Sequence, residues 1–413
     1  MEEKRILIIG AGLSGLVAAI HCEKAGLHPI LLEATDRVGG RVKTDQESGA
    51  LLDHGFQVLL TAYAEAQRYL DFSKLDLQYF ASGALIFNGQ KKIRIADPLR
   101  TPSRLLDMVF SSVGTIKDKY LVFRLSQELK KSSAAAIFDQ QIGSTRSFLK
   151  EYGFSEGMIE RFFRPFFGGI FLENALQTPA SMFKFVFKMF AEGKAAIPAE
   201  GMAAIPDQLF AQLQNTKIHF NTKVEKIENH EVCTSDGQRM PFDKLIIAGN
   251  PYTLLPNLKG QSLDYYGTSN LYYVAETSPL QENIIALVSN SESLINNFCV
   301  LTDVSSTYLE GPGHLVSVTL KDIPGPEERA DFYQLIAEEI KQICQISGAM
   351  RMIKRFDIHH ALPINEMLAY SLPNTQFSLT DDIFLAGDHL LNASIDASMR
   401  SGRLAAEALI HRL

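Results

Sequence analysis

The chain has 413 residues, 46% of them hydrophobic, which is enough for two or three domains' worth of core. Its net charge of −7 argues against a nucleic-acid-binding surface, which needs a basic face. The first predicted strand begins at Ile6, so we expect no signal peptide, and the uncharged run 6–20 is too short to span a membrane. The four scattered cysteines form no CxxC pair, so we expect no metal site, no disulfide framework and a cytoplasmic location.

Residues 5–33 predict a strand, a glycine turn, a helix and a second strand that ends in an acid. The apolar run 6–9 leads into Gly-Ala-Gly-Leu-Ser-Gly at 10–15, and a second apolar run ends at Glu33. Such glycines permit a tight turn, close approach of the backbone to a pyrophosphate, and close packing of the helix on the strand. The helix N-terminus favours phosphate, and Glu33 stands where a carboxylate would accept a hydrogen bond from a ribose hydroxyl. The pattern predicts a dinucleotide-binding fold.

The segment Asp-Arg-Val-Gly-Gly-Arg at 36–41 distinguishes FAD from NAD. Paired glycines between two arginines suit a diphosphate. Together with the 10–15 turn and Glu33, this segment resembles the flavin-containing amine oxidase superfamily, which includes protoporphyrinogen oxidases and phytoene desaturases. The resemblance implies bound FAD. The residues of this region that it places at the cofactor are Gly10, Gly12, Leu13, Ser14, Glu33, Ala34, Gly39, Gly40 and Arg41.

Two further segments carry the resemblance through the middle of the chain. Asp-His-Gly-Phe-Gln at 53–57 is similar to a superfamily segment beside the flavin ring, which implies that Gly55, Phe56 and Gln57 contact the cofactor. His54 is more simply explained as a hydrogen-bonded loop histidine. The Pro-x-x-Gly-Met-x-x-x-Pro pattern at 198–206 resembles the desaturase and protoporphyrinogen oxidase branches, and the position of Val224 implies a backbone pair with adenine.

The region between these segments has the most unusual composition in the chain. The Asn-Gly pair at 88–89 predicts a hairpin turn, and residues 103–190 are expected to be mostly helical. Nine of the 26 phenylalanines fall in a short part of it: Phe162, Phe163, Phe166, Phe167, Phe171, Phe183, Phe185, Phe187 and Phe190. They predict either the core of a helical subdomain, or an apolar substrate channel or membrane-contacting face.

Residues 262–375 are predicted to form a substrate-side sheet backed by one amphipathic helix at 327–345. The apolar side of that helix is expected to carry Phe332, Leu335, Ile336, Ile340 and Ile343. We expect the tyrosines of this region to be core residues rather than catalytic ones.

The C-terminal region completes the resemblance. A buried-strand pattern at 383–386 is closed by Gly387 and Asp388, and a helix opens after Ser394. The resemblance implies that Gly387 and Asp388 contact the ribityl and phosphate part of FAD, and that Ser394 and Ile395 begin a helix aimed at the flavin pyrimidine ring. A helix N-terminus there would stabilise the negative charge of reduced flavin. In amine-oxidising members the position of Ser394 is usually a tyrosine of an aromatic cage.

We therefore predict an α/β fold of two discontinuous domains. The FAD-binding domain is a Rossmann-like unit of 1–75, 196–255 and 380–413. The substrate-binding domain comprises 76–195 and 256–379, with a mixed β-sheet and the helical subdomain.

The predicted function is hydride transfer from an apolar substrate to flavin, as in a desaturase or dehydrogenase. An FAD amine oxidase, and a flavoprotein with redox-neutral isomerase or structural flavin, are the alternatives; a plain NAD dehydrogenase is a minor fourth. Ser394 turns the prediction away from amine oxidation. The expected partner is a small apolar molecule, with peripheral membrane contact as an open alternative. The catalytic residue, the electron acceptor and the oligomeric state are left open.

Overall fold

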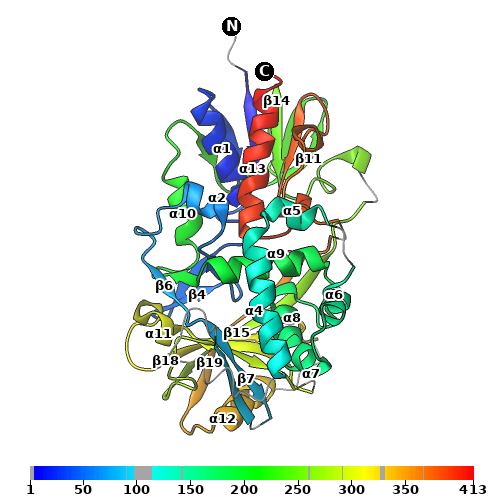
Figure 1. Cartoon of the computed structure of the whole chain (residues 1–413). Helices are drawn as coiled ribbons and strands as arrows, with labels where there is room; N and C mark the ends of the chain where they lie inside the picture. Colours follow the sequence, from blue (N-terminus) through cyan, green and yellow to red (C-terminus); the bar gives the residue numbers. More distant parts are fainter. Residues whose placement is uncertain are drawn as a thin grey trace.

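A computed structural model describes residues 4–89, 91–96, 114–140, 143–258, 261–290, 292–325, 331–365 and 367–413. A parallel sheet with helices α1 and α13 occupies one end of the molecule, where both termini also lie, and a larger mixed sheet occupies the other end (Figure 1). The helices α4 to α9 lie beside the junction of these two parts. Segments from both ends of the sequence thus meet in one part of the molecule.

The first sheet has five parallel strands in the order β10-β2-β1-β14-β20. Its strands are β1 (Ile6–Ile9), β2 (Ile30–Leu32), β10 (Lys217–His219), β14 (Lys244–Ala248) and β20 (Ile383–Ala386). β1 is the central strand and β14 lies beside it, and both are nearly continuous apolar runs, because a parallel sheet is buried on both faces. α1 (Leu13–Lys24) and α13 (Ile395–Ile410) pack closely against each other, since a Cβ at Gly402 would lie 2.1 Å from the Ser14 carbonyl oxygen.

Smaller elements surround this sheet. The antiparallel pair β3 (Thr44–Glu47) and β4 (Ala50–Asp53) follows the second glycine segment. A three-stranded sheet has the order β5 (Leu59–Leu60), β9 (Ala195–Pro198) and β6 (Leu77–Tyr79), and another comprises β11 (Val224–Glu228), β12 (Glu231–Thr234) and β13 (Arg239–Pro241). The short helices are α2 (Ala64–Tyr69) and α10 (Ala204–Phe210). β9 follows the helical region in the sequence and pairs with β5 and β6, which precede that region.

The second large sheet has seven strands in the order β19-β15-β18-β17-β16-β7-β8. They are β7 (Gly83–Asn88), β8 (Lys91–Ala96), β15 (Tyr265–Ala275), β16 (Ile285–Val288), β17 (Ile295–Val300), β18 (His314–Leu320) and β19 (Met350–Pro363). α12 (Phe332–Cys344) packs on one face through an apolar cluster that includes Phe298, Val316 and Ile340. The predicted hairpin at 88–89 and the backing helix are confirmed, but residues 326–330 lie outside the described part. Leu335, expected on the apolar side, is exposed.

The helical region contains α4 (Ile116–Lys131), α5 (Ala134–Phe138), α6 (Thr145–Tyr152), α7 (Glu156–Met158), a π-helical turn at Ile159–Phe163, α8 (Arg164–Phe171) and α9 (Ala180–Glu192). The predicted end of α6 at Gly153 is confirmed by its left-handed backbone, φ +101°. Residues 103–113 lie outside the described part. Phe163, Phe167, Phe183 and Phe185 are buried, as expected for the core of a helical subdomain. Phe166, Phe171 and Phe190 line a cavity, and the substrate channel and the membrane-contacting face stay predictions.

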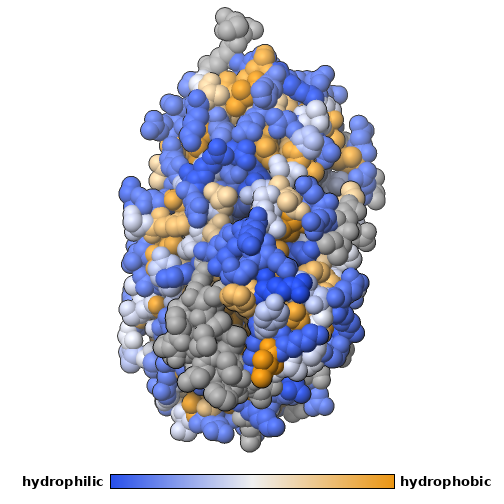
Figure 2. Space-filling model, viewed as in Figure 1, coloured by the Kyte–Doolittle hydropathy of each residue, from blue (hydrophilic) through white to orange (hydrophobic). Residues whose placement is uncertain are grey.

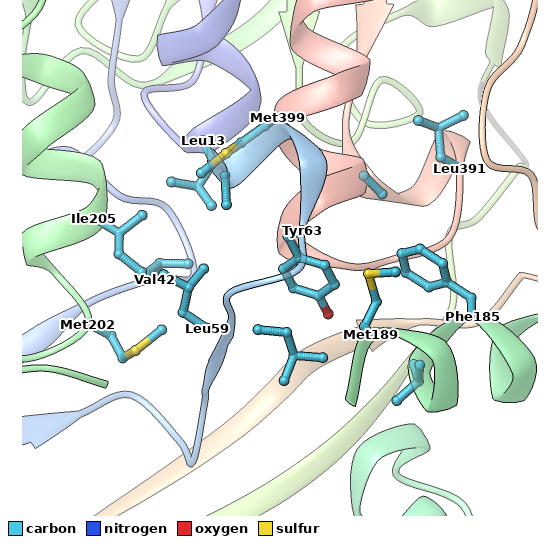
Figure 3. Close-up of a cluster of buried hydrophobic side chains, with 14 of the residues drawn as sticks. Leu13, Val42, Leu59, Tyr63, Phe185, Met189, Met202, Ile205, Leu391 and Met399 are labelled. Carbon is cyan, nitrogen blue, oxygen red and sulfur yellow. The ribbon is translucent and has the colours of Figure 1, made fainter. Parts of the chain in front are cut away.

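One apolar core connects the parallel sheet with the helices. Figure 3 shows a part of it, where side chains from α1, α9, α10, α13 and the segment around Tyr63 gather. The Tyr63 ring stacks on Phe185 with 6.1 Å between ring centroids. On the face shown in Figure 2, hydrophilic residues predominate and apolar residues occur in small groups between them. No helix in the described ranges combines the length and apolarity needed to cross a membrane.

Candidate active site

The glycine turn between β1 and α1 forms one wall of the site. Gly10 has φ +97°, and a Cβ at Gly15 would lie only 1.9 Å from the Gly10 carbonyl oxygen. Larger side chains at these two positions are therefore excluded by the backbone path. The α1 N-terminus begins after Gly12, which supplies no side-chain cap. Its N–H groups are thus available to an anionic ligand, as expected for a phosphate site.

The second glycine pair packs directly onto the first turn. Gly39 forms an isolated parallel bridge with Gly12, and the Gly39 N–H donates to the Ala11 carbonyl at 2.9 Å. A Cβ at Gly40 would lie 3.2 Å from the Gly12 Cα. Two loops can approach this closely only where side chains are absent. The glycines of the 36–41 segment therefore allow the two loops to contact each other, and both of these glycines also line the cavity described below.

Glu33 fixes the end of β2 against the glycine turn. Its Oε2 accepts a hydrogen bond from the Ala11 N–H at 2.8 Å, and its Oε1 accepts from the Thr35 N–H at 2.9 Å and the Thr35 hydroxyl at 2.8 Å. The side chain is buried but also lines the cavity. Glu33 thus holds the turn in shape, and carboxylate oxygens have further lone pairs for a ribose hydroxyl.

The C-terminal segment meets the second glycine pair through an ion pair. The Arg41 guanidinium contacts the Asp388 carboxylate and also donates to the Ala361 carbonyl at 3.2 Å. Gly387 has φ +152°, and the His389 ring lies where a Cβ at Gly387 would be, with Cε1 2.3 Å away. His389 is buried, burial lowers its pKa, and its Nε2 has no partner in the described part of the chain.

Helix α13 presents its N-terminus to the same space. Ser394 caps this helix by accepting from the Ala397 N–H at 3.0 Å, and its hydroxyl donates to Asn392 Oδ1 at 2.7 Å. The Ser14 hydroxyl donates to the Ser398 carbonyl at 2.8 Å and so ties α1 to α13. Two helix N-termini are therefore held together at one site, and both bring partial positive charge to it.

The segment after β4 supplies another edge. His54 Nε2 lies 2.9 Å from Asp45 Oδ2, which confirms the predicted hydrogen-bonded loop histidine. Gly55 has φ +90°, and a Cβ there would lie 2.6 Å from Ile358 Cδ1. The Gln57 amide donates to the Arg41 carbonyl at 3.2 Å, while its Oε1 is buried and unpartnered within the described ranges.

These segments surround one large cavity of about 1300 Å³. Fifteen of the seventeen residues predicted to bind the cofactor line it: Gly10, Gly12, Leu13, Ser14, Glu33, Gly39, Gly40, Arg41, Gly55, Phe56, Gln57, Gly387, Asp388, Ser394 and Ile395. Ala34 is exposed and Val224 is buried in an apolar cluster on one face of the parallel sheet, and neither lines the cavity. Their roles, like those of the other fifteen, stay predictions.

The remaining lining residues come mainly from 138–190, 265–319 and 356–368. Several of these side chains were not singled out in the sequence, among them Tyr63, His389, Asn297 and Thr319. These residues belong to no motif that can be recognised in the sequence. The strand register or a turn brings them to the cavity, and neither could be predicted. His389 directly follows the Gly-Asp motif, and this was the one signal that could have identified it.

The arrangement fits a dinucleotide. Two glycine loops in backbone contact, an uncapped helix start, a buried carboxylate at the end of β2 and a second helix N-terminus are the donor set that a pyrophosphate with its ribose requires. The fold and this site define the class of dinucleotide-binding α/β enzymes.

Within that class, residues 13–410 match the family model described as flavin-containing amine oxidoreductase, so the chain belongs to this family. It is an oxidoreductase that uses FAD. The L-amino acid oxidase of Bothrops pictus is 23% identical, with 98% of this chain and 89% of that protein covered. Protoporphyrinogen oxidase 2 of Arabidopsis thaliana is 27% identical over 40% of this chain and 32% of its own length, so this match spans about a third of the plant protein.

Among solved structures, an oxidoreductase from Methanosarcina mazei superposes with a TM-score of 0.72 at 18% identity, covering 98% of this chain and all of that one. This likeness shows the fold. The division of the chain into two domains at the predicted boundaries is a separate matter and stays a prediction.

Proposed function

We propose that the chain oxidises a largely apolar, uncharged substrate by hydride transfer from a substrate carbon to FAD, as a desaturase or dehydrogenase does. The observation that carries the proposal is the chemistry of the cavity away from the glycine loops. The lining residues on α8, α9 and β16 are mainly apolar: Phe166, Ile170, Phe171, Met182, Val186, Phe190, Ile285 and Leu287. Such a wall favours an apolar ligand by burying its surface.

Residues of this chain would hold the cofactor at the glycine loops, at Glu33 and at the two helix N-termini. FAD, when bound, supplies the group that accepts a hydride. The apolar wall would exclude water and orient the substrate, and Tyr63 with Leu13 would separate the cofactor part of the cavity from the core shown in Figure 3.

The charged groups of the cavity support the same proposal. The three carboxylates that line the cavity in the described ranges are engaged within the protein: Glu33 accepts from Ala11 and Thr35, Asp388 pairs with Arg41, and Asp357 accepts from Arg355 and Ser269. A free amine substrate usually needs a carboxylate or an aromatic cage. Ser394 is engaged as a helix cap and carries no ring. These features speak against amine oxidation, the first alternative.

Anaerobic mixing of the FAD-loaded protein with two panels tests the proposal. Putrescine, benzylamine and common L-amino acids should leave the flavin absorption band oxidised. A panel of polyisoprenoids and a porphyrinogen should contain a compound that bleaches it. Rapid bleaching by any of the amines would overturn the proposal and restore the amine oxidase. An apolar compound converted to an isomer, with the band unchanged after turnover, would favour the redox-neutral alternative.

A further inference from the structure

A bulge in strand β17 places two adjacent asparagines on the cavity side of the seven-stranded sheet. Ile295 pairs with Leu320, but the next pair is Asn297 with Thr319, so Asn296 is an extra residue without a partner in this register. Asn296 and Asn297 are only 4% and 6% exposed, and the Asn297 amide donates to Asn296 Oδ1 at 2.9 Å. Bulges of this kind redirect side chains and are common beside active sites.

The strand register continues this polar group across the sheet. Asn297 lies opposite Thr319 on β18, and Thr319 lies opposite Asn270 on β15. The opposite face of the same strands is apolar and packs under α12, through Phe298, Val318 and Leu271 among others. A row of three polar residues therefore faces the cavity side of a sheet whose other side is core.

The members of this row differ in how their hydrogen-bonding groups are used. Asn270 Oδ1 accepts from the Thr319 hydroxyl at 3.1 Å, and its amide donates to the Ser317 hydroxyl at 3.1 Å. Asn297 and Thr319 line the cavity, whereas Asn270 does not. In the described part of the chain, the bond to Asn296 is the hydrogen bond that the Asn297 side chain makes, and its amide oxygen is not fully buried but open to the cavity. An amide that lines a cavity and has spare hydrogen-bonding capacity can bind a polar group of a ligand there.

Helix α8 is pressed onto the asparagine pair at a glycine. A Cβ at Gly169 would lie 2.3 Å from Asn296 Oδ1 and 3.1 Å from Asn297 Nδ2. Gly169 itself lines the cavity. The absence of a side chain lets the helix approach and restricts the asparagines to one arrangement. The amide group of Asn297 is consequently pre-organised rather than mobile.

The surroundings determine which chemistry Asn297 can recognise. The lining residues on α8, β16, β17 and β18 are Phe166, Gly169, Ile170, Phe171, Ile285, Leu287, Asn297 and Thr319, and all of them are uncharged. A carboxylate, phosphate or ammonium group would thus be buried there without a counter-charge, which is costly. The N–H and C=O of the Asn297 amide match a group that both donates and accepts.

We propose that Asn297 and Thr319 form a specificity site for an uncharged donor–acceptor group, a hydroxyl or a carboxamide, on an otherwise apolar substrate. This inference rests on the proposed function, because it concerns the same cavity. It narrows the substrate class from apolar molecules in general to neutral molecules with a single polar group. Asn297 would select the substrate and take no part in the reaction itself.

Binding of four ten-carbon probes to the FAD-loaded protein tests the inference without turnover. The probes are decanol, decanamide, decanoate and decylamine, and perturbation of the oxidised flavin spectrum reports binding. Wild type should bind decanol and decanamide at least tenfold more tightly than decanoate and decylamine. Asn297→Leu should reduce that preference to less than threefold. Because only the oxidised band is followed, failure here is distinguishable from bleaching by amines, which would refute the proposed oxidation instead.

A matched pair of charge variants guards against misfolding of the leucine variant. Asn297→Asp keeps the volume and should shift the preference toward decylamine by at least tenfold. Asn88→Asp adds the same charge at the exposed end of β7, in the same sheet but outside the cavity lining, and should change the ranking by less than twofold. The inference is overturned if wild type shows no preference for the neutral probes, including no response to any probe. Equal effects of the two aspartate variants would overturn it as well.

Discussion

Arg41 and Asp388 form an ion pair that joins segments 347 positions apart in the sequence. Asp388 has only 10% of its side chain exposed, while Arg41 has 41%. The arginine follows the second glycine pair and the aspartate follows the last strand of the parallel sheet. The pair therefore closes the two ends of the chain around the cavity and places one cation and one anion at its rim.

Replacement of Arg41 by Ala should leave Asp388 largely buried without its partner. We expect FAD affinity to fall at least tenfold and stability to fall by about 1–3 kcal/mol, the cost of an unsatisfied buried group. Fluorescence titration of the apoprotein with FAD measures the affinity. Arg37→Ala is the matched control, because Arg37 pairs with Asp45 but does not line the cavity. An equal loss of affinity in both variants would contradict a specific role for Arg41.

Glu33 holds the glycine turn in shape and is predicted to bind the ribose of FAD, and Glu33→Gln tests the second of these roles. In the described part of the chain, the three groups that hydrogen-bond to its carboxylate are all donors, so an amide N–H₂ must face one of them. Loss of charge-assisted hydrogen bonds, worth about 1.5–3 kcal/mol, should weaken FAD binding roughly 10- to 100-fold. The same titration gives this value. Unchanged affinity in a folded variant would show that Glu33 does not hold the ribose.

Because of Asp53, we expect the stability of the folded protein to fall as the pH rises from acidic values. Burial raises the pKa of Asp53 to about 6, despite hydrogen bonds from Thr44, Met202 and Tyr308. The unfolded chain ionises this group near pH 4, so between about pH 4 and 6 the folded state binds more protons and its stability falls as pH rises. Relative to Asp53→Asn, wild type should lose roughly 2–3 kcal/mol across this range, from the difference of about two pKa units.

Denaturant unfolding of both proteins at several pH values between 4 and 7 measures this loss. Asp45→Asn is the control with the opposite sign, because the bonds from Arg37 and His54 outweigh burial and lower the pKa of Asp45. Because the folded pKa of Asp45 lies below its unfolded value near 4, the stability of wild type relative to that variant should be nearly constant between pH 4 and 7 and should fall when the pH is lowered to 3. A constant difference between wild type and Asp53→Asn would mean that Asp53 ionises at an ordinary pH.

Two substitutions of Ser394 test whether the flavin lies beside the N-terminus of α13. Ser394→Ala removes the hydrogen bond to the Ala397 N–H and should cost about 1 kcal/mol, whereas Ser394→Asp preserves a capping acceptor. The aspartate also adds negative charge beside the proposed flavin position, so the reduction potential of bound FAD should fall in Ser394→Asp but little in Ser394→Ala. Dye-equilibration during anaerobic reduction measures it. Equal potentials in the two variants would place the flavin away from this helix end.

The sequence was informative where a local pattern fixes the backbone. The glycines at 10, 12, 39 and 40 could be assigned to one cofactor site from the turn pattern and the family resemblance; all four line one cavity, and Gly12 contacts Gly39 and Gly40. Asn297 could not be predicted, since its direction depends on a bulge and on pairing with a strand 22 residues later. Leu335 fits a helical apolar pattern, yet the packing of α12 leaves it exposed, because periodicity alone does not define how wide the covered face is.

The cavity needs residues from Gly10 to Ser398, and this has a consequence for biosynthesis. β1 and α1 emerge from the ribosome early, but their partners β14, β20 and α13 follow only at 244–410. The nascent glycine turn must therefore wait, with the apolar face of α1 uncovered, until α13 has been synthesised. The complete cofactor site is therefore assembled only after the last of these segments has been synthesised. Prematurely terminated chains should accordingly be colourless, aggregation-prone and readily degraded, whatever the flavin concentration in the cell.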